Sequence, residues 1–303
     1  MSGRASTPMR ILMSGAGGTV GRALAPALAA DGHAIFRLVR TRPRGAGEFR
    51  WDPTAGILDP AAIDSCDAVI HLAGASIAAG RWTRSRKAEI MESRRAGTRL
   101  IASAIARASP APRVLISASA VGYYGDRGDE VLTEASAPGG GFLAEVARAW
   151  EEAAARAAPT RVVLLRQGVV LARAGGALPR MALPFRLGLG GPIGGGRQWM
   201  SWIVLEDLVR VFAHVLASDT LDGPVNVVSP HPVTQRDFSR SLGRVLHRPA
   251  FLPTPGWAIR LVLGEMAKDL LLSSQRVSPG RLLATGFEFE HADVEESLSF
   301  VLR

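Results

Sequence analysis

The chain of 303 residues has one cysteine and two tyrosines, and aromatic residues make up only 6% of it. A single cysteine, Cys66, excludes an internal disulfide and is typical of a protein from a reducing compartment. No apolar run reaches the roughly 18 residues that cross a membrane. Met1–Pro8 also lacks the apolar segment of a secretion signal. We therefore expect a cytoplasmic protein with no membrane partner.

Lysine is nearly absent, which decides how the net charge of +9 is interpreted. Lys87 and Lys268 are the two lysines, and the remaining formal positive charges are arginines spread along the chain without a basic block. Two tyrosines also leave little aromatic surface for stacking on bases. The charge therefore predicts a solvated basic surface and no nucleic-acid partner.

Two further classes of site lack their sequence patterns. The six histidines do not stand at metal-ligand spacing, and neither HExxH nor CxxC occurs, so we expect no metal. The Gly-x-Ser-x-Gly pattern of many serine hydrolases is also absent. Hydrophobic residues nevertheless make up 47% of the chain, which is enough for a large folded core.

Short apolar segments alternate with segments of helical spacing. Strands are expected at 9–14, 33–39, 49–52, 68–72, 114–117, 162–166 and 225–228, and helices at 19–30, 84–107 and 142–157. This alternation predicts an α/β fold, a Rossmann-type doubly wound parallel sheet with helices on both faces. The expected nucleotide domain is 9–171, completed by 197–228. Segments 172–196 and 229–303 are richer in glycine and proline, and we expect them to form a small substrate or partner lobe.

A glycine-rich loop follows the first expected strand and opens the first expected helix. It reads Gly15-Ala-Gly-Gly-Thr-Val-Gly21. Gly15 would form the tight turn, Gly18 would let the backbone approach a pyrophosphate, and Gly21 would let helix and strand pack closely. Amides at the helix N-terminus favour phosphate there. The predicted cofactor-binding residues of this loop are Gly15, Gly17, Gly18, Thr19, Val20 and Gly21.

The end of the second expected strand indicates which dinucleotide binds. A carboxylate at this position would bind the ribose hydroxyls of NAD, but none is present. Arg40 and Arg42 stand there instead. A guanidinium group suits the 2′-phosphate of NADP(H), and we therefore expect that cofactor, with Arg40 as the first candidate.

Beyond the loop, several motifs carry a family resemblance. They are His71-Leu-Ala-Gly74, Ser117-Ala-Ser-Ala-Val-Gly-Tyr-Tyr-Gly125, Arg81-Trp-Thr83, Glu92-Ser-Arg-Arg-Ala-Gly-Thr98, Gln198-Trp-Met-Ser-Trp-Ile203 and Gly264-Glu-Met-Ala267. The chain resembles an atypical extended short-chain dehydrogenase/reductase. More closely, it is similar to the epimerase family with a C-terminal domain of unknown function. The resemblance runs from about Met9 to the C-terminus and implies an NADPH-binding Rossmann domain, with a lobe completed by the tail.

The resemblance also implies roles for particular residues. His71, Leu72, Ala73 and Gly74 should line the ribose and pyrophosphate side of the cofactor. Ser119 matches the serine that hydrogen-bonds a substrate carbonyl in the wider superfamily. Further cofactor contacts are implied for Ser93, Ser117, Arg166, Gly168, Val169 and Val170, of which Ser93 stands where many extended members have asparagine, and Arg166 and Gly168–Val170 resemble the segment under the nicotinamide.

One part of the superfamily pattern fails. Its reaction uses a tyrosine and a lysine four residues later on one helix, because the lysine lowers the pKa of the tyrosine. Tyr123 and Tyr124 are followed at that spacing by Arg127 and Gly128, and the expected helix at 142–157 contains neither residue type. The usual Tyr-x-x-x-Lys pair is therefore absent.

Two explanations remain open for this chain. In the first, NADPH supplies hydride and Tyr123, Tyr124 or Glu145 supplies the proton, Glu145 through a pKa raised by burial. The protein would then be an oxidoreductase or epimerase acting on a carbonyl or sugar-like small molecule, held by Ser119. In the second, catalysis is lost and the protein is a regulatory or interaction protein that binds NADPH. A monomer or a homodimer fits either explanation.

Overall fold

A computed structural model of the chain describes residues 7–303 and contains a central sheet of eight strands. The strands are β1 (Arg10–Ser14), β2 (Ala34–Val39), β3 (Glu48–Asp52), β4 (Ile57–Leu58), β5 (Ala68–His71), β6 (Val114–Ala120), β8 (Arg161–Gln167) and β12 (Gly223–Val227). Their order is β12-β8-β6-β5-β1-β2-β3-β4, and every pair is parallel except β3 with β4. The predicted α/β fold with a parallel Rossmann-type sheet is confirmed.

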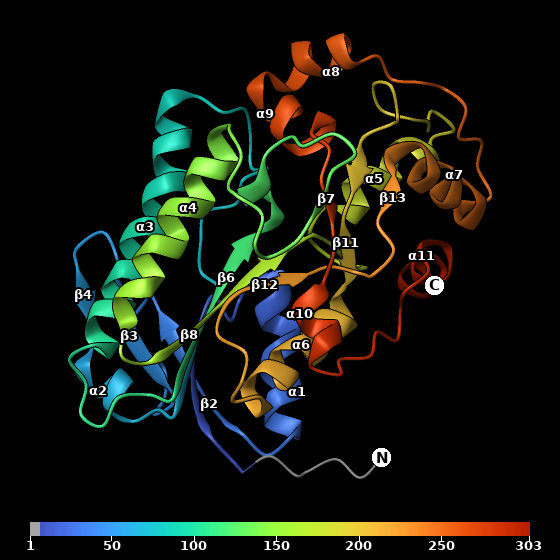
Figure 1. Cartoon of the computed structure of the whole chain (residues 1–303). Coiled ribbons are helices and arrows are strands. Elements are labelled where there is room, and N and C mark those ends of the chain that lie inside the picture. The colour runs from blue at the N-terminus through green and yellow to red at the C-terminus, as the bar shows by residue number, and fades with distance from the viewer. Residues whose placement is uncertain (1–6) are drawn as a thin grey trace.

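Helices cover both faces of this sheet, as Figure 1 shows. Helices α1 (Thr19–Ala30) and α6 (Leu205–Ala217) lie together on one face. Helices α3 (Arg84–Ile105) and α4 (Phe142–Ala154) lie on the other, next to the short α2 (Pro60–Asp64). The chain leaves β1 toward β2 on one side and later adds β5 on the other side of β1. The carboxyl ends of β1 and β5 therefore form the switch point at which open α/β sheets bind ligands.

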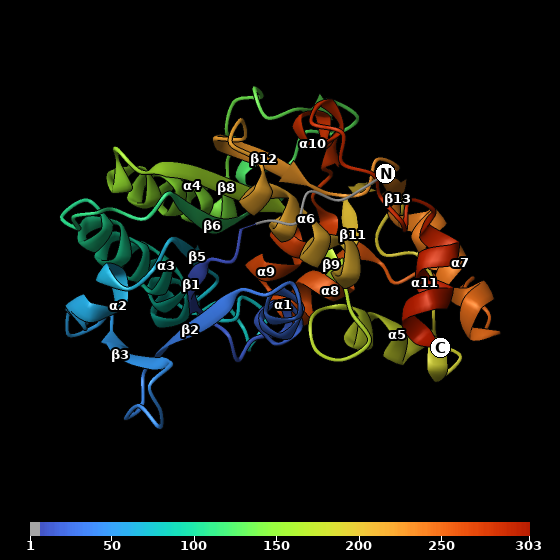
Figure 2. The same cartoon turned by 90° about the horizontal axis from the view of Figure 1, so that it is seen from below.

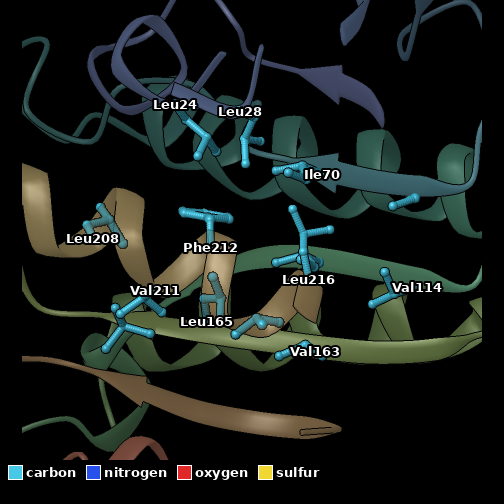
Figure 3. Packing of buried hydrophobic residues seen from close by; sticks show 14 of the residues in the cluster. Leu24, Leu28, Ile70, Val114, Val163, Leu165, Leu208, Val211, Phe212 and Leu216 are labelled. Atoms are coloured by element: carbon cyan, nitrogen blue, oxygen red, sulfur yellow. The ribbon is translucent and has the colours of Figure 1, made fainter. Parts of the chain in front are cut away.

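The two faces of the sheet bury alternate residues of each strand, because successive side chains of a strand point to opposite faces. In β1, Ile11 and Met13 belong to the core beneath α1 and α6, whereas Leu12 belongs to the core beneath α3. Figure 3 shows the first of these cores, with Phe212 of α6 lying toward Leu24 and Leu28 of α1. The sheet is thus fixed from both sides around the switch point.

The rest of the chain packs beside this sheet, and Figure 2 shows most of it on the side of α1 and α6. It contains β9 (Val169–Leu171), α5 (Leu178–Arg186), β10 (Trp199–Met200), β11 (Trp202–Val204), β13 (Val233–Thr234), α7 (Gln235–Leu246), α8 (Gly256–Leu263), α9 (Glu265–Ala267), a π-helical turn at Lys268–Leu272, α10 (Gly280–Ala284) and α11 (Val294–Leu302). β9 pairs with β11, and β13 pairs with β10. Trp202, Phe238 and Leu298 are members of a separate hydrophobic cluster formed by these elements.

The expected elements differ from the observed ones mainly at their ends. β6 runs to Ala120, so Ser119 lies on the strand instead of after it, and a 3₁₀ turn at Val121–Tyr124 follows directly. Two further two-residue strands, β7 (Val131–Leu132) and β14 (Arg276–Val277), pair with each other. Most of the segment Met1–Pro8 lies outside the described residues. Within residues 7–303, no helix combines the length and the apolar character that crossing a membrane requires.

The core between α6 and α1 gives a first testable prediction. Replacing the fully buried Phe212 by alanine should lower the free energy of unfolding by about 3–5 kcal/mol, because the lost side chain leaves a cavity between packed elements. Phe251, which is 72% exposed, is the matched control, and Phe251→Ala should change this free energy by about 0.5 kcal/mol or less. Urea unfolding followed by circular dichroism measures both; equal losses would contradict the assignment of Phe212 to the core.

Candidate functional site

The glycine loop borders a cavity of about 960 Å³ at the switch point. Gly15 has φ of +72°, and a Cβ there would lie 2.8 Å from the carbonyl carbon of Leu72. A Cβ on Gly21 would collide with the carbonyl oxygen of Gly15, whereas one on Gly17 would meet nothing within 4 Å. No side chain caps the N-terminus of α1 at Gly18. Its first amides therefore face an open, backbone-lined cradle of the kind that binds phosphate.

A buried serine–histidine pair braces this cradle from behind. Ser14 accepts hydrogen bonds from the amides of Leu72 (3.2 Å) and Ala73 (3.4 Å), and its Oγ lies 2.6 Å from Nδ1 of His71. With its oxygen engaged by two amides, the hydroxyl donates its proton to Nδ1, which leaves the imidazole proton on Nε2. Burial, with a smaller contribution from the positive charge of Arg94, lowers the pKa of His71 to about 3, so the ring is neutral.

His71 therefore has a different place from the one that the resemblance implied. It is fully buried, whereas the cavity is lined from this strand end by Leu72, Ala73 and Gly74. Its side chain points into the protein, and its hydrogen bond to Ser14 joins the end of β5 to the end of β1.

Basic side chains also line the cavity. Arg40 lines it, together with Arg37 of β2 and Arg22 of the first turn of α1. Glu48 lines it as well, and its carboxylate accepts a hydrogen bond from the amide of Arg44. Arg42 is exposed and is not among the lining residues. The structure thus brings together Arg40 and two arginines that sequence reasoning missed.

The remaining expected cofactor residues lie outside the lining of this cavity. Thr19 and Val20 open helix α1, and Ser93 accepts a hydrogen bond from the amide of Ala75 (3.0 Å). Ser117 is buried and donates to the carbonyl of Ala118. Gly168, Val169 and Val170 form the close approach of β8 and β9 to β11, where a Cβ on Gly168 would lie 2.6 Å from the carbonyl oxygen of Ser201.

A buried ion pair lies at the carboxyl ends of β6 and β8. Arg166 of β8 donates from Nε and Nη2 to the two carboxylate oxygens of Glu151, both at 2.8 Å. Ser119 donates its hydroxyl proton to the same carboxylate at 2.7 Å. One edge of the Arg166 guanidinium is thus held by Glu151. Ser119 turns an oxygen lone pair, not its proton, toward any further partner.

The two tyrosines flank the guanidinium of Arg166 in different ways. Tyr124 is fully buried; its hydroxyl donates to Oδ1 of Asn226 (2.6 Å) and accepts from Nη1 of Arg166 (2.9 Å). Burial raises the pKa of Tyr124, although the nearby charge of Arg166 works against this. Tyr123 is partly exposed, and its ring lies 3.5 Å from the guanidinium carbon. Within residues 7–303, the hydroxyl of Tyr123 makes no hydrogen bond.

C-terminal residues close over the start of α3 and α4. Arg81 donates to the carbonyl of Leu261 (3.4 Å), and the ammonium of Lys87 binds the carboxylate of Glu265 at 2.8 and 2.9 Å. The amide of Leu143 donates to Asp269 (3.3 Å), whose pKa is raised by burial. The tail is therefore tied to the helix end at which the superfamily places its tyrosine and lysine.

Comparison with known sequences agrees with this geometry. The sequence profile of the NAD dependent epimerase/dehydratase family matches residues 11–228, and that of a domain of unknown function, DUF1731, matches residues 254–301. The chain belongs to the NAD dependent epimerase/dehydratase family. An epimerase family protein of Mycobacterium leprae is 42% identical over 98% of this chain and 97% of its own length.

Solved structures resemble this family member over its whole length. The crystal structure of human epimerase family protein SDR39U1 (isoform 2) with NADPH is 36% identical, with a TM-score of 0.88 over 97% of this chain and 99% of that one. A nucleoside-diphosphate sugar epimerase from Corynebacterium glutamicum is 35% identical, with a TM-score of 0.81, and covers 98% of this chain and 58% of its own. The predicted family is confirmed.

In this epimerase-family chain, the buried carboxylate of α4 is Glu151 and not the expected Glu145. Glu145 is exposed on α4, so the burial on which its proposed role depended is wrong. Glu151 is the buried carboxylate of the helix. Helical spacing predicts that Glu151 is buried, because it follows the buried Ala147 by four residues and Ala144 by seven. Glu145 falls on the opposite, solvated face.

The neutral His71 gives this family member a testable dependence on pH. Below its ordinary pKa of 6.5 the unfolded chain binds a proton on His71 that the folded protein does not bind. The free energy of unfolding therefore keeps its full value above a pH of 6.5. It decreases as the pH falls from there toward 3, by up to ~1.4 kcal/mol per pH unit. His71→Asn keeps an acceptor for Ser14 and takes up no proton. Urea unfolding from about pH 7 to about pH 4 should show a shallower loss for this variant; parallel curves would contradict the burial of a neutral imidazole.

Proposed function

We propose that the protein binds NADP(H), with the pyrophosphate on the loop from Gly15 to Gly21 and the 2′-phosphate at Arg40. The cavity at the switch point carries this proposal. It combines an uncapped helix N-terminus, a backbone cradle at the glycine loop and three arginines among its lining residues. Each of these features favours negative charge, and together they fit a dinucleotide with three phosphate groups. The structure of human SDR39U1 with NADPH supports the choice of cofactor.

We further propose that the bound cofactor serves the reduction or epimerisation of a carbonyl-bearing or sugar-like small molecule. NADPH supplies hydride, and a protein group must give the substrate oxygen a proton. Tyr123 is the best placed of the three expected donors, because its hydroxyl is free while that of Tyr124 is engaged and Glu145 is exposed. Similarity to the nucleoside-diphosphate sugar epimerase from Corynebacterium glutamicum supports the substrate class.

Ser119 would act as an acceptor in this site. Its proton is directed to Glu151, so the oxygen can accept a hydrogen bond from a substrate hydroxyl. The alcohol form of the substrate would therefore bind to Ser119 more favourably than the carbonyl form, since a carbonyl brings no proton to share. Polarisation of a carbonyl by Ser119 would require its proton to leave Glu151.

A second function is supported by the same residues. The chain lacks the Tyr-x-x-x-Lys pair, and the tail is bonded to the helix end where that pair would stand. A regulatory protein that binds NADPH, interacts with a partner and catalyses no reaction fits both observations. The two functions differ in a measurable way, because only the first requires Tyr123.

We assign residues 9–171 and 197–228 to the nucleotide part and 172–196 and 229–303 to the lobe, since the separate cluster around Trp202 and Phe238 draws mainly on the latter. A reducing compartment such as the cytoplasm suits the single thiol. Cys66 is buried, and burial raises its pKa to about 12, so it is an unreactive thiol.

The choice between the two dinucleotides can be tested at Arg40. Arg40→Met should weaken NADPH binding by about 10- to 100-fold and leave NADH binding nearly unchanged, because only NADPH carries the 2′-phosphate. Titration followed by nucleotide fluorescence measures both affinities. Arg42→Met is the matched control, since Arg42 does not line the cavity, and it should bind both nucleotides as the unmodified protein does. Equal loss for both nucleotides in Arg40→Met would contradict the assignment.

The two tyrosines separate catalysis from structure. Tyr123→Phe should reduce NADPH-dependent turnover of a responsive carbonyl compound by about 10²- to 10⁴-fold, with unchanged NADPH affinity and melting temperature. Tyr124→Phe leaves Oδ1 of Asn226 without its donor and should lower the free energy of unfolding by about 1–3 kcal/mol. If Tyr123→Phe retains full turnover, Tyr123 is not the proton donor. If no carbonyl compound is turned over while NADPH binds tightly, the second function is favoured.

A further inference from the structure

Arg94 of α3 lies directly behind the nucleotide cavity. Its guanidinium carbon is 3.2 Å from the position that a Cβ on Gly74 would take, and Gly74 lines the cavity. Its Nη1 donates to the carbonyls of Ala75 (3.0 Å) and Ile90 (3.2 Å). The other side of the group lies over the ring of Trp150, with 4.9 Å between the guanidinium carbon and the ring centre. The charge is thus held at a fixed place beside the loop that follows β5.

This charge has no acidic partner among the described residues. Arg166 is paired with Glu151, and Arg86, its neighbour on the same helix, is paired with Glu89. Burial, with a smaller contribution from the positive charge of Arg86, lowers the pKa of Arg94 to about 10, and no carboxylate acts in the opposite direction. Removing a cation from water without a counter-charge is unfavourable. An anionic ligand would offset this cost.

The geometry leaves donors for such a ligand. Nε and Nη2 of Arg94 make no hydrogen bond within residues 7–303, and neither atom is completely shielded from solvent. Both nitrogens therefore keep some contact with solvent, beside the cavity-lining Gly74. Ser93 and Arg94 together hold the peptide at Ala75 through its amide and its carbonyl, which keeps the guanidinium in place next to Gly74.

We propose that Arg94 is an oxyanion-binding residue of the nucleotide site and that its ligand is the pyrophosphate of the bound dinucleotide. The inference rests on the proposed binding of NADP(H). It adds a charged contact to a cradle that the glycine loop otherwise forms from backbone alone. It also places one fixed positive charge beside the cofactor in a chain that lacks the lysine of its superfamily. Arg94 and Arg40 then divide the ligand, one binding the pyrophosphate and the other the 2′-phosphate.

This division can be tested with three ligands. They are NADPH, NADH and adenosine 2′-phosphate, which has no pyrophosphate. Arg94→Met, which keeps an unbranched apolar stem over Trp150, should weaken NADPH and NADH by the same factor of about 10- to 100-fold and spare adenosine 2′-phosphate. Arg40→Met should weaken NADPH and adenosine 2′-phosphate and spare NADH. Arg94→Lys, which keeps the charge, should recover part of the loss. Isothermal titration calorimetry measures all affinities.

A purely structural role predicts a different result. If Arg94 served only to hold the carbonyls of Ala75 and Ile90, Arg94→Met would lower the melting temperature of the ligand-free protein. It would leave the increase caused by NADPH unchanged, whereas under our proposal that increase becomes smaller.

Each outcome decides the matter. Unchanged dinucleotide affinity in Arg94→Met, or equal weakening of adenosine 2′-phosphate, overturns the inference and leaves NADP(H) binding intact. A lower ligand-free melting temperature in Arg94→Met together with an unchanged increase on adding NADPH also overturns it. If the unmodified protein binds neither NADPH nor NADH, the proposed function itself fails, and the Arg94 variants are not needed to show it.

Discussion

The nucleotide cavity depends on one close contact between two backbones. The turn at Gly15 approaches the peptide between Leu72 and Ala73 so closely that no Cβ fits between them. The parallel pairing of β1 with β5 brings these chain segments together, and the Ser14–His71 pair fixes their spacing. Any wider separation would move the cradle away from the amides of α1. The uncapped helix end, the cavity and the arginines around it are useful only while this contact is kept.

The ion pair between Arg166 and Glu151 has a second organising role. Buried ion pairs contribute little net stability, since desolvation offsets most of the attraction, but loss of one partner is costly. Here the pair joins β8 to α4, and Tyr124 and Asn226 extend the network to β12. Its chemical consequence is the direction of one hydrogen bond. Because Ser119 donates its hydrogen bond to this carboxylate, its oxygen is left as an acceptor.

The sequence predicted the local features of this site and missed the contacts that depend on distant packing. The glycine loop, the strand alternation and the position of Arg40 are local patterns, and the structure has the predicted sheet with Arg40 at the cavity. The direction of the Ser119 hydrogen bond depends on residues 32 positions apart, and no local pattern contains it. Helical spacing distinguishes the two carboxylates of α4, because it places Glu151 and not Glu145 on the buried face. In so arginine-rich a chain, Arg22, Arg37 and Arg94 could not be distinguished from surface residues without the fold.

The absence of the Tyr-x-x-x-Lys pair is better understood together with the C-terminal tail. Where the pair would begin, α4 starts with Phe142, and Lys87 lies over its ring at 4.6 Å while binding Glu265 of the tail. Asp269 accepts the amide of the next residue, Leu143. These contacts use the start of α4 to hold the tail, so the reduction that we propose has to take its proton donor from another element. The 3₁₀ turn after β6 is the remaining element at this edge with a free phenol, and that makes Tyr123 the residue on which the distinction between an enzyme and a binding protein depends.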